Sequence, residues 1–248
     1  MPNLPFHIAT AHKIASILGD EYVSEDVWGY CLLGSTVPDI RAMTKRPRSE
    51  THFTELTLKS IGEGTTMMFS IHPELKSSSI DPKMKAFLCG YISHLICDET
   101  WITKMYRPYF SEANRKYSEI ESNLWDRALQ LELDSWSIEL IENKKLLHLI
   151  PENITDIHLD FIEERDLQEW ITWVRNLAGR GFSWDRLYNA MNRMHRNDSS
   201  VTNTVDEFIK AIDSNLRVIH DYLEPDILSW YLENTVSVSV STIKRYLN

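Results

Sequence analysis

The most constraining feature of the sequence is the apolar stretch from residue 82 to 106, within which His94 and Asp98 lie four residues apart. Apolar side chains fall on nearly all sides of a helix drawn over this stretch, a pattern typical of a helix at the centre of its domain. On such a helix His94 and Asp98 share one face, one turn apart. Because a buried carboxylate is costly unless something compensates it, this pair suggests a metal ion beside the helix.

The rest of the chain also predicts helices. Apolar periodicity and stop signals predict helices over residues 6–18, 24–33, 119–143, 163–178, 184–196, 203–223 and from 225 onward, with a short helix between loops in 62–83. Valine and serine alternate over 236–241 as in a strand, but no partner strand is in view, so we expect a helix there. The predicted fold class is all-α, a multi-helix bundle in a single domain 1–248, with a metal-site half (1–145) and a helical C-terminal extension (151–248) packed on it.

Composition excludes some classes of protein. The chain has 36 Asp and Glu against 26 Lys and Arg, a formal net charge of −10, which argues against a broad nucleic-acid-binding surface. Cys31, Cys89 and Cys97 lie in apolar contexts without a CxxC pair, so we expect them reduced and buried. The sequence shows no signal-peptide pattern and no run of about 18 apolar residues, and we therefore expect a soluble, cytoplasmic protein without a transmembrane segment.

Side chains outside the central helix could complete a metal site. His12 lies about 140° around the helix axis from His7, so only one of the two is expected to face a site, and His7 is the better candidate. Asp39 follows a glycine and a proline on a connection expected to be irregular, where functional side chains are often presented. The candidate ligand set holds three imidazoles and two carboxylates, a mixture suited to zinc: His7, Asp39, His52, His94 and Asp98. Taken singly, each histidine also has a structural interpretation and each aspartate can be a cap or turn former.

A basic cluster follows Asp39, with Arg41, Lys45, Arg46 and Arg48 within eight residues. Arginine binds phosphate or carboxylate bidentately, so Arg41 and Arg48 are candidate substrate-binding residues. The alternative is a solvated loop. Arg107 and Arg127 could join the cluster if their helix ends face the same cavity. The tryptophans of the second half are expected in the core or in a subunit contact, which leaves room for a homo-oligomer.

Four segments together resemble the zinc-dependent phospholipase C family, whose all-helical fold is shared with single-strand-specific fungal nucleases. In order and approximate spacing they are Phe6-His7, a Gly-x-x-x-Pro-Asp motif over 34–39, Thr51-His52-Phe53 and a Gly-x-x-x-His-x-x-x-Asp motif over 90–98. The resemblance covers roughly residues 5–135. It implies Zn²⁺ as cofactor, one or two ions. Asp39, His52, His94 and Asp98 would then surround the first ion, and Asp98 would bridge to a second ion that also takes His7.

The sequence departs from the family pattern at the second and third ions. Secreted members use the amino group of the mature N-terminus as a ligand, whereas six residues precede His7 here. The third ion takes a histidine about six residues after the helical aspartate, where this chain has Lys104, and a His-x-x-x-Glu pair for which the nearest equivalents are Asp126 and Gln130. We therefore expect the third site to be lost in its usual form. Asp126 either supplies a carboxylate to the substrate site or lies on a solvated helix face.

The resemblance and the basic cluster predict a zinc-dependent hydrolase acting on a phosphoester, a phospholipase C-like phosphodiesterase. Asp39 is the expected catalytic residue, ligating zinc and orienting the attacking water. The expected partner is a small anionic or phosphoester substrate, contacted by Arg41, Arg48 and Asp126. One alternative is a metal-dependent lyase, cyclase or non-phosphate hydrolase of a small metabolite. Another is a non-catalytic structural metal protein, whose zinc site would be closed.

Overall fold

The computed structural model describes residues 1–76, 80–196, 198 and 200–247, and no strand occurs among them, so the predicted all-α class is correct. The α-helices are α1 (Leu4–Leu18), α2 (Trp28–Gly34), α3 (Arg41–Thr44), α4 (Arg48–Thr51), α5 (Glu63–Ile71), α6 (Pro82–Thr100), α7 (Arg107–Tyr109), α8 (Glu119–Asn143), α9 (Glu164–Arg175), α10 (Arg186–Met194), α11 (Ser200–Lys210), α12 (Ile212–Tyr222) and α13 (Ile227–Tyr246). Shorter elements are the 3-10 helices η1 (Glu25–Val27), η2 (Val37–Ile40), η3 (Pro73–Lys76), η5 (Leu146–His148) and η6 (Asn176–Arg180), and the π-helix η4 (Trp101–Tyr106).

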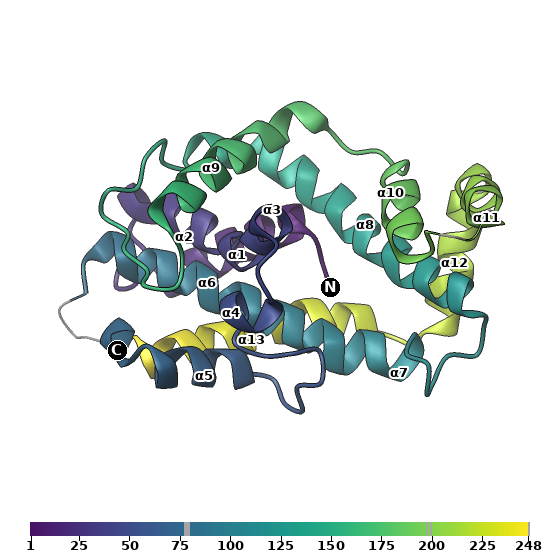
Figure 1. Ribbon diagram of the computed structural model, residues 1–248, viewed down its shortest axis with the longest axis horizontal. Helices are drawn as coiled ribbons and strands as arrows, with labels where there is room; N and C mark the ends of the chain where they lie inside the picture. Colours follow the sequence, from purple (N-terminus) through teal and green to yellow (C-terminus); the bar gives the residue numbers. More distant parts are fainter. Residues whose placement is uncertain (77–79, 197, 199, 248) are drawn as a thin grey trace.

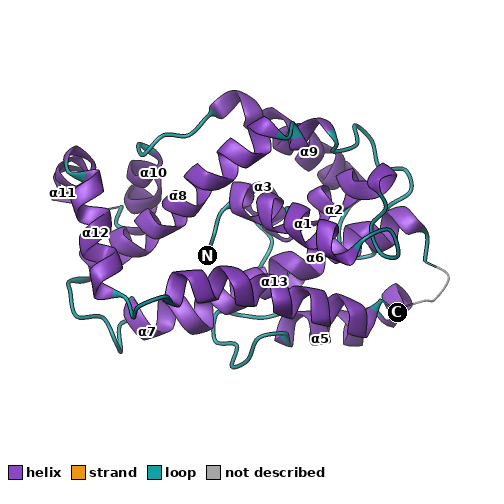
Figure 2. Ribbon diagram, turned by 180° about the vertical axis from the view of Figure 1, so that it is seen from behind, coloured by secondary structure: helices purple, strands orange, loops and turns teal. Residues whose placement is uncertain are grey.

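Helix α6 is the central helix, as its all-round apolar pattern predicts. Every residue from 86 to 100 is buried. Helices α1, α2, α5 and α13 pack against it. Figure 1 shows α6 crossing the middle of the molecule, and Figure 2, from behind, shows α13 alongside it. The side chain of Asp81 accepts a hydrogen bond from the Lys83 backbone N–H at 2.8 Å and so caps the start of the helix.

Helices α2 and α6 cross closely because each presents a glycine to the other. A Cβ atom on Gly90 would lie 1.9 Å from the carbonyl oxygen of Cys31, and one on Gly34 would lie 2.0 Å from the carbonyl oxygen of Phe87. Only glycine allows two backbones to approach this closely. The crossing holds the chain that follows α2, including Ser35 and η2, against the middle of α6.

The helical rod that begins with α6 continues beyond residue 106, where the apolar stretch of the sequence ends. After α6 the chain forms the π-helical turn η4 and then the short helix α7, in which Pro108 is tolerated because the first N–H groups of a helix lack intrahelical partners. A π-helical turn changes the rotation per residue, and such turns are frequent near functional sites. Trp101, the first residue of this turn, is buried, whereas Lys104 within the turn is exposed.

Two further predictions of local structure differ from the fold. Residues 203–223 form two helices rather than one, because Ala211 has non-helical angles (φ −121°, ψ 34°). The side-chain amide of Asn215 donates to the carbonyl of Phe208 at 2.9 Å and satisfies an acceptor freed by the break. Asp39 lies on the 3-10 helix η2 rather than on irregular chain. The valine–serine alternation of 236–241 lies within α13, so its helical prediction is confirmed.

The C-terminal helices pack onto the first half of the chain. Trp170 of α9 is buried and donates its indole N–H to Thr36 Oγ1 at 3.0 Å, so it belongs to the core. Tyr231 of α13 stacks on Phe6 of α1, with ring centroids 5.9 Å apart. The division into a metal-site half and a C-terminal extension stays a prediction.

Two expectations from composition concern the cysteines and the membrane. Cys31, Cys89 and Cys97 are free and buried, as expected. Among the described residues no helix is both long enough and apolar enough to cross a membrane.

Candidate metal centre

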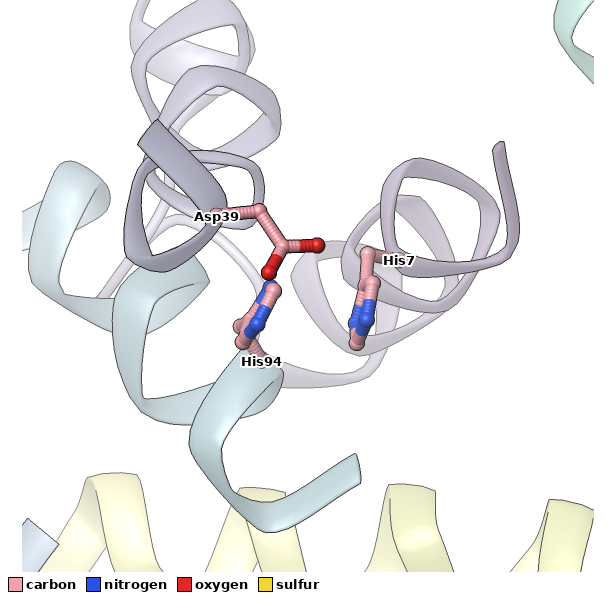
Figure 3. Close-up of side chains that lie close together, drawn as sticks. All are labelled: His7, Asp39 and His94. Atoms are coloured by element: carbon pink, nitrogen blue, oxygen red, sulfur yellow. The ribbon is translucent and has the colours of Figure 1, made fainter. Parts of the chain in front are cut away.

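The candidate ligands come from separate elements and meet beside the middle of α6. His7 lies on α1, Asp39 on η2, His52 directly after α4, and His94 and Asp98 on α6. Two overlapping groups, His7–Asp39–His94 and His52–His94–Asp98, each offer ligand atoms that lie within 4.8 Å of one another. Figure 3 shows the Asp39 carboxylate turned toward the rings of His94 and His7.

Three ligand atoms of the second group form a compact triangle. His52 Nε2 and His94 Nε2 are 3.3 Å apart, and Asp98 Oδ2 lies 3.2 Å from the first and 3.7 Å from the second. Ligand atoms about 2.0–2.1 Å from zinc at tetrahedral angles are separated by about 3.3 Å. The triangle therefore fits one face of a tetrahedral zinc site. Asp39 Oδ1 lies beside it, 3.7 Å from His52 Nε2.

Hydrogen bonds behind the rings orient both histidines of the triangle. His94 Nδ1 lies 2.8 Å from the carbonyl oxygen of Ser35. A carbonyl only accepts, so the Nδ1 atom carries the proton and the Nε2 lone pair faces the triangle. Thr51 Oγ1 is 3.1 Å from Nδ1 of His52 and holds that ring in place by a hydrogen bond in which either group can donate. Metal-ligating histidines usually have such a partner on the second nitrogen.

His7 faces the other oxygen of Asp98. Its ring stacks on that of His94 with centroids 3.8 Å apart, and its Nε2 atom lies 3.4 Å from Asp98 Oδ1. Both ring nitrogens of His7 and Asp98 Oδ1 are buried without a hydrogen bond in the described structure. Unsatisfied buried polar atoms are uncommon in native proteins, and a cation between His7 Nε2 and Asp98 Oδ1, which lie 3.4 Å apart, would satisfy these two atoms. The residues present therefore fit the zinc ion that the family resemblance implies.

Arg48 compensates the charge of Asp98. The Arg48 side chain is 6% exposed and donates from Nη2 to Asp98 Oδ2 at 3.0 Å. Burial alone would raise the pKa of Asp98, but the neighbouring His94, His52 and His7 rings and the charge of Arg48 together hold it well below its usual range. The interpretation of the basic cluster as a solvated loop is wrong for Arg48.

The other basic residues of this cluster point elsewhere. Arg46 donates to the carbonyl of Phe161 at 2.6 Å. Lys45 donates to the carbonyl of Ala42 at 2.5 Å. Arg41 makes no hydrogen bond or ion pair with the described residues, and its Nε atom is enclosed, so its role toward a substrate stays a prediction.

Burial keeps the three imidazoles neutral. It lowers the pKa of His7 and of His94, and it lowers that of His52 to about 3. Neutral imidazoles can bind a metal ion without first losing a proton. Asp39 differs, because its side chain is 29% exposed and forms the open edge of the group. Its partial burial, and then the charge of Asp98, raise the pKa of Asp39 to about 6.

The residues at the positions of the family's third ion make other contacts. Asp126 is 2% exposed and accepts hydrogen bonds from Trp101 Nε1 at 2.9 Å and from Gln130 Nε2 at 2.8 Å. The expectation of a solvated helix face is therefore wrong for Asp126, and its contact with a substrate stays a prediction. Lys104 lies in a shallow surface depression beside Trp230.

Glu99 is a buried carboxylate that the sequence interpretation missed. It accepts hydrogen bonds from the backbone N–H groups of Gly62 and of Gly64, the latter at 2.7 Å, and so anchors the start of α5 to α6. Burial raises the pKa of Glu99 to about 7. Its sequence signal is the same as that of Asp98, a carboxylate within an apolar helix. Asp98 and Glu99 are adjacent on α6, but Asp98 belongs to the candidate metal centre and Glu99 holds the start of α5.

The fold and this group of side chains define an all-α protein with a buried histidine–aspartate centre. The family model described as zinc dependent phospholipase C matches residues 6–179, and the chain belongs to this family. The match contains the five candidate ligands and extends beyond residue 135, through α9. Neither the curated proteins nor the solved structures include a match to the chain.

Proposed function

We propose that the protein is a phospholipase C-like phosphodiesterase, a zinc-dependent hydrolase that acts in the cytoplasm on a small phosphoester. The observation that carries the proposal is the triangle of His52 Nε2, His94 Nε2 and Asp98 Oδ2, whose spacing suits tetrahedral zinc. Membership of a zinc-dependent phospholipase C family supports the phosphoester as the substrate class.

The triangle together with Asp39 would hold the proposed first ion, and His7 with Asp98 would hold the second. Asp98 directs Oδ1 toward His7 and Oδ2 toward His52. A carboxylate that divides its oxygens in this way is suited to bridge two ions. With one ion, Asp98 would act as an ordinary ligand of the triangle.

The exposure of Asp39 favours catalysis over a structural role. Bound zinc would supply Lewis-acid polarisation of a phosphoryl oxygen and activation of a water molecule. The other four candidate ligands are at most 1% exposed, so substrate and water reach the centre past Asp39, which is 29% exposed. Asp39 can orient a water molecule through its carboxylate. Arg48 offsets negative charge on the phosphoryl group.

The decisive experiment measures metal content and turnover on the same protein. Protein purified without added metal should contain zinc by elemental analysis and should hydrolyse bis(p-nitrophenyl) phosphate. Chelation should abolish turnover and zinc should restore it. The pair His94→Ala with Asp98→Asn should lose the metal, whereas Asp39→Asn should lose most of the turnover while retaining some zinc.

His12→Ala is the matched control, because the His12 ring packs against Trp28 with centroids 4.9 Å apart and lies outside the candidate ligand set. It should keep both zinc and turnover. Protein without a bound transition metal, or metal content unchanged in the double variant, would contradict the proposal. Full zinc occupancy without phosphoesterase turnover would instead favour the lyase, cyclase or structural alternatives.

A further inference from the structure

We infer that Tyr91 and Phe53 are positioning residues of the candidate metal centre, which hold His52 with its imidazole directed into the centre. They act on the main chain on either side of His52, Tyr91 through the carbonyl of Thr51 and Phe53 through its own backbone conformation. The inference rests on the proposed function for the role of the His52 imidazole as a zinc ligand. The position of that imidazole can also be tested without metal.

His52 follows a helix that is too short to position it. Helix α4 consists of the four residues Arg48–Thr51, and His52 comes directly after it. A single helical turn is unstable by itself, because nucleation of a helix fixes several residues for one hydrogen bond. The position of His52 therefore depends on contacts between this segment and the rest of the protein. The hydrogen bond from Arg48 to Asp98 is one such contact, at the start of α4.

The hydroxyl of Tyr91 holds the residue before His52. Tyr91 is fully buried on α6 and donates a hydrogen bond to the backbone carbonyl of Thr51. The side-chain oxygen of Thr51 in turn lies 3.1 Å from Nδ1 of His52. Because Tyr91 lies three residues before His94, α6 carries both a candidate ligand and the group that fixes the segment of His52 beside it.

The residue after His52 has an uncommon backbone conformation. Phe53 has a φ of +59°, in the left-handed region, which costs free energy for residues other than glycine and is an outlier for a bulky side chain. Such strain persists only where the surrounding structure enforces it, and it is concentrated at functional sites. The turn separates two consecutive rings. The His52 ring lies beside that of His94, with centroids 5.2 Å apart, whereas the Phe53 ring packs among other aromatic side chains.

These aromatic side chains keep Phe53 in its strained conformation. Phe53 is 6% exposed, and its ring centroid lies 5.1 Å from that of Phe161, 5.8 Å from that of His72 and 6.3 Å from that of Tyr91. Burial of an aromatic ring and edge-to-face contacts are favourable and offset the strain. If residue 53 returned to a negative φ, its ring would leave these partners and the main chain of His52 would turn with it.

The start of α5 restricts the main chain of His52 from another side. A Cβ atom on Gly64 would lie 2.6 Å from the carbonyl oxygen of His52. Gly64 is itself held in place, because its backbone N–H donates to Glu99 at 2.7 Å. The His52 carbonyl thus has no room to move toward α5. Tyr91 and Phe53 restrain the residues on either side of this fixed point.

The first test removes only the hydroxyl of Tyr91. In Tyr91→Phe the Thr51 carbonyl loses its donor, and zinc affinity, measured by competition with a chromogenic chelator, should fall about fivefold or more. The absorption bands of cobalt(II) bound in place of zinc should change as well, because they report the geometry of the ligands. Tyr222→Phe is the matched control, since the Tyr222 hydroxyl also donates to a backbone carbonyl, that of Tyr109 at 2.9 Å. It should leave zinc affinity and the cobalt(II) spectrum unchanged.

The second test separates the backbone conformation of Phe53 from the packing of its ring. Phe53→Ala and Phe53→Gly both remove the ring, but only glycine adopts a positive φ without strain. Zinc affinity should therefore be about fivefold or more lower in Phe53→Ala than in Phe53→Gly. A role in packing alone predicts equal affinities or the opposite order, because glycine makes the chain more flexible than alanine does.

The third test follows the His52 ring in the metal-free protein. NMR of the chelated protein labelled with ¹⁵N-histidine detects the ring nitrogens, and the signals of His52 are identified by their loss in His52→Ala. These signals should shift in Tyr91→Phe and in Phe53→Ala but not in Tyr222→Phe. Circular dichroism checks that each variant is folded. If Phe53→Ala is unfolded, Tyr91→Phe, which loses a single oxygen atom, decides the question.

The inference and the proposed function can fail separately. A Tyr91→Phe protein with a lower melting temperature but wild-type zinc affinity and His52 signals would overturn the positioning role of Tyr91. Equal zinc affinity in Phe53→Ala and Phe53→Gly would overturn that of Phe53. Both results leave the zinc-dependent turnover of the wild-type protein standing. A wild-type protein without zinc or turnover would remove the proposed phosphodiesterase, and the NMR signals of His52 would still decide whether Tyr91 and Phe53 position its ring.

Discussion

The Nε2 atoms of His52 and His94 lie 3.3 Å apart, and both lie within 3.7 Å of Asp98 Oδ2. The proton of His94 is held at Nδ1 by the Ser35 carbonyl, so the Nε2 atom of His94 offers only a lone pair. The positions of the two Nε2 atoms thus depend on the hydrogen bonds made by the Nδ1 atoms of the same rings. This geometry depends on the crossing of α2 with α6, which supplies the Ser35 carbonyl.

Removing the hydroxyl behind His52 should weaken zinc binding. Thr51→Val deletes the Oγ1 atom that lies 3.1 Å from His52 Nδ1. Because such partners fix the tautomer and ring orientation of a ligand, zinc affinity should fall about 10-fold to 100-fold, measured by competition with a chromogenic chelator. Thr54→Val is the control, since the Thr54 hydroxyl contacts the backbone carbonyl of His52 rather than its ring. Equal affinities in both variants would mean that packing alone orients the ring.

Chelation of the metal should lower the melting temperature of the protein. A ligand that binds only the folded state stabilises it by about 2.7 kcal/mol when its concentration is 100 times its dissociation constant. His7 Nε2 and Asp98 Oδ1, both unsatisfied without a ligand, would lose their cation. His94→Ala, if it binds no zinc, should show no further decrease with chelator. A melting temperature that chelator leaves unchanged in the zinc-containing protein would contradict a metal ion at this centre.

Asp134 should make stability depend on pH between about 4 and 7. Burial raises the pKa of this α8 carboxyl from 3.8 to about 7, although Asn3 donates to Oδ2 at 2.7 Å. The folded protein therefore keeps a proton that the unfolded chain releases above about pH 4. Stability is greatest below that pH, declines as pH rises, and the full penalty is present above about pH 7.

Asp134→Asn removes this dependence. The melting temperature of the variant relative to the wild-type protein should rise from pH 4 to pH 8, with chelator present throughout so that metal binding does not contribute. Glu99, whose pKa is also about 7, titrates in both proteins and cancels in the comparison. A constant difference across this range would show that Asp134 stays ionised in the folded state.

The central helix and the candidate ligands could be predicted because their signals are local. The four-residue spacing of His94 and Asp98 can be read from the sequence and places both on one face of a helix. The start of α8 likewise has a local signal, the capping box of Ser118 and Glu121. The break at Ala211 could not be predicted, because the apolar pattern continues across it.

Other features depend on contacts between distant segments. The burial of Asp126 follows from an indole N–H supplied by Trp101, 25 residues away. The different surroundings of Arg46 and Arg48 follow from the positions of α9 and α6, whereas in the sequence both are simply members of one basic cluster. Sequence patterns thus identify the candidate site residues better than they identify the residues that hydrogen-bond to them.

Gly90→Ala should disturb both the fold and the candidate centre. The added Cβ atom would lie 1.9 Å from the Cys31 carbonyl oxygen, which is backbone and cannot rotate away. Helix α2 must then move from α6, at a cost of about 1–3 kcal/mol or more. The same movement would displace the Ser35 carbonyl from His94 Nδ1. We expect a lower midpoint in urea unfolding together with weaker zinc binding.

Ser93→Ala is the control for Gly90→Ala, because the Ser93 hydroxyl donates to the Gly90 carbonyl within the same helix. It should change the unfolding midpoint little and leave zinc binding unchanged. Gly34→Ala, on the opposite side of the crossing, should reproduce the effects of Gly90→Ala, since its Cβ atom would meet the Phe87 carbonyl oxygen at 2.0 Å. Wild-type stability in both glycine variants would mean that the two helices can separate without cost. The crossing would then not be what positions His94.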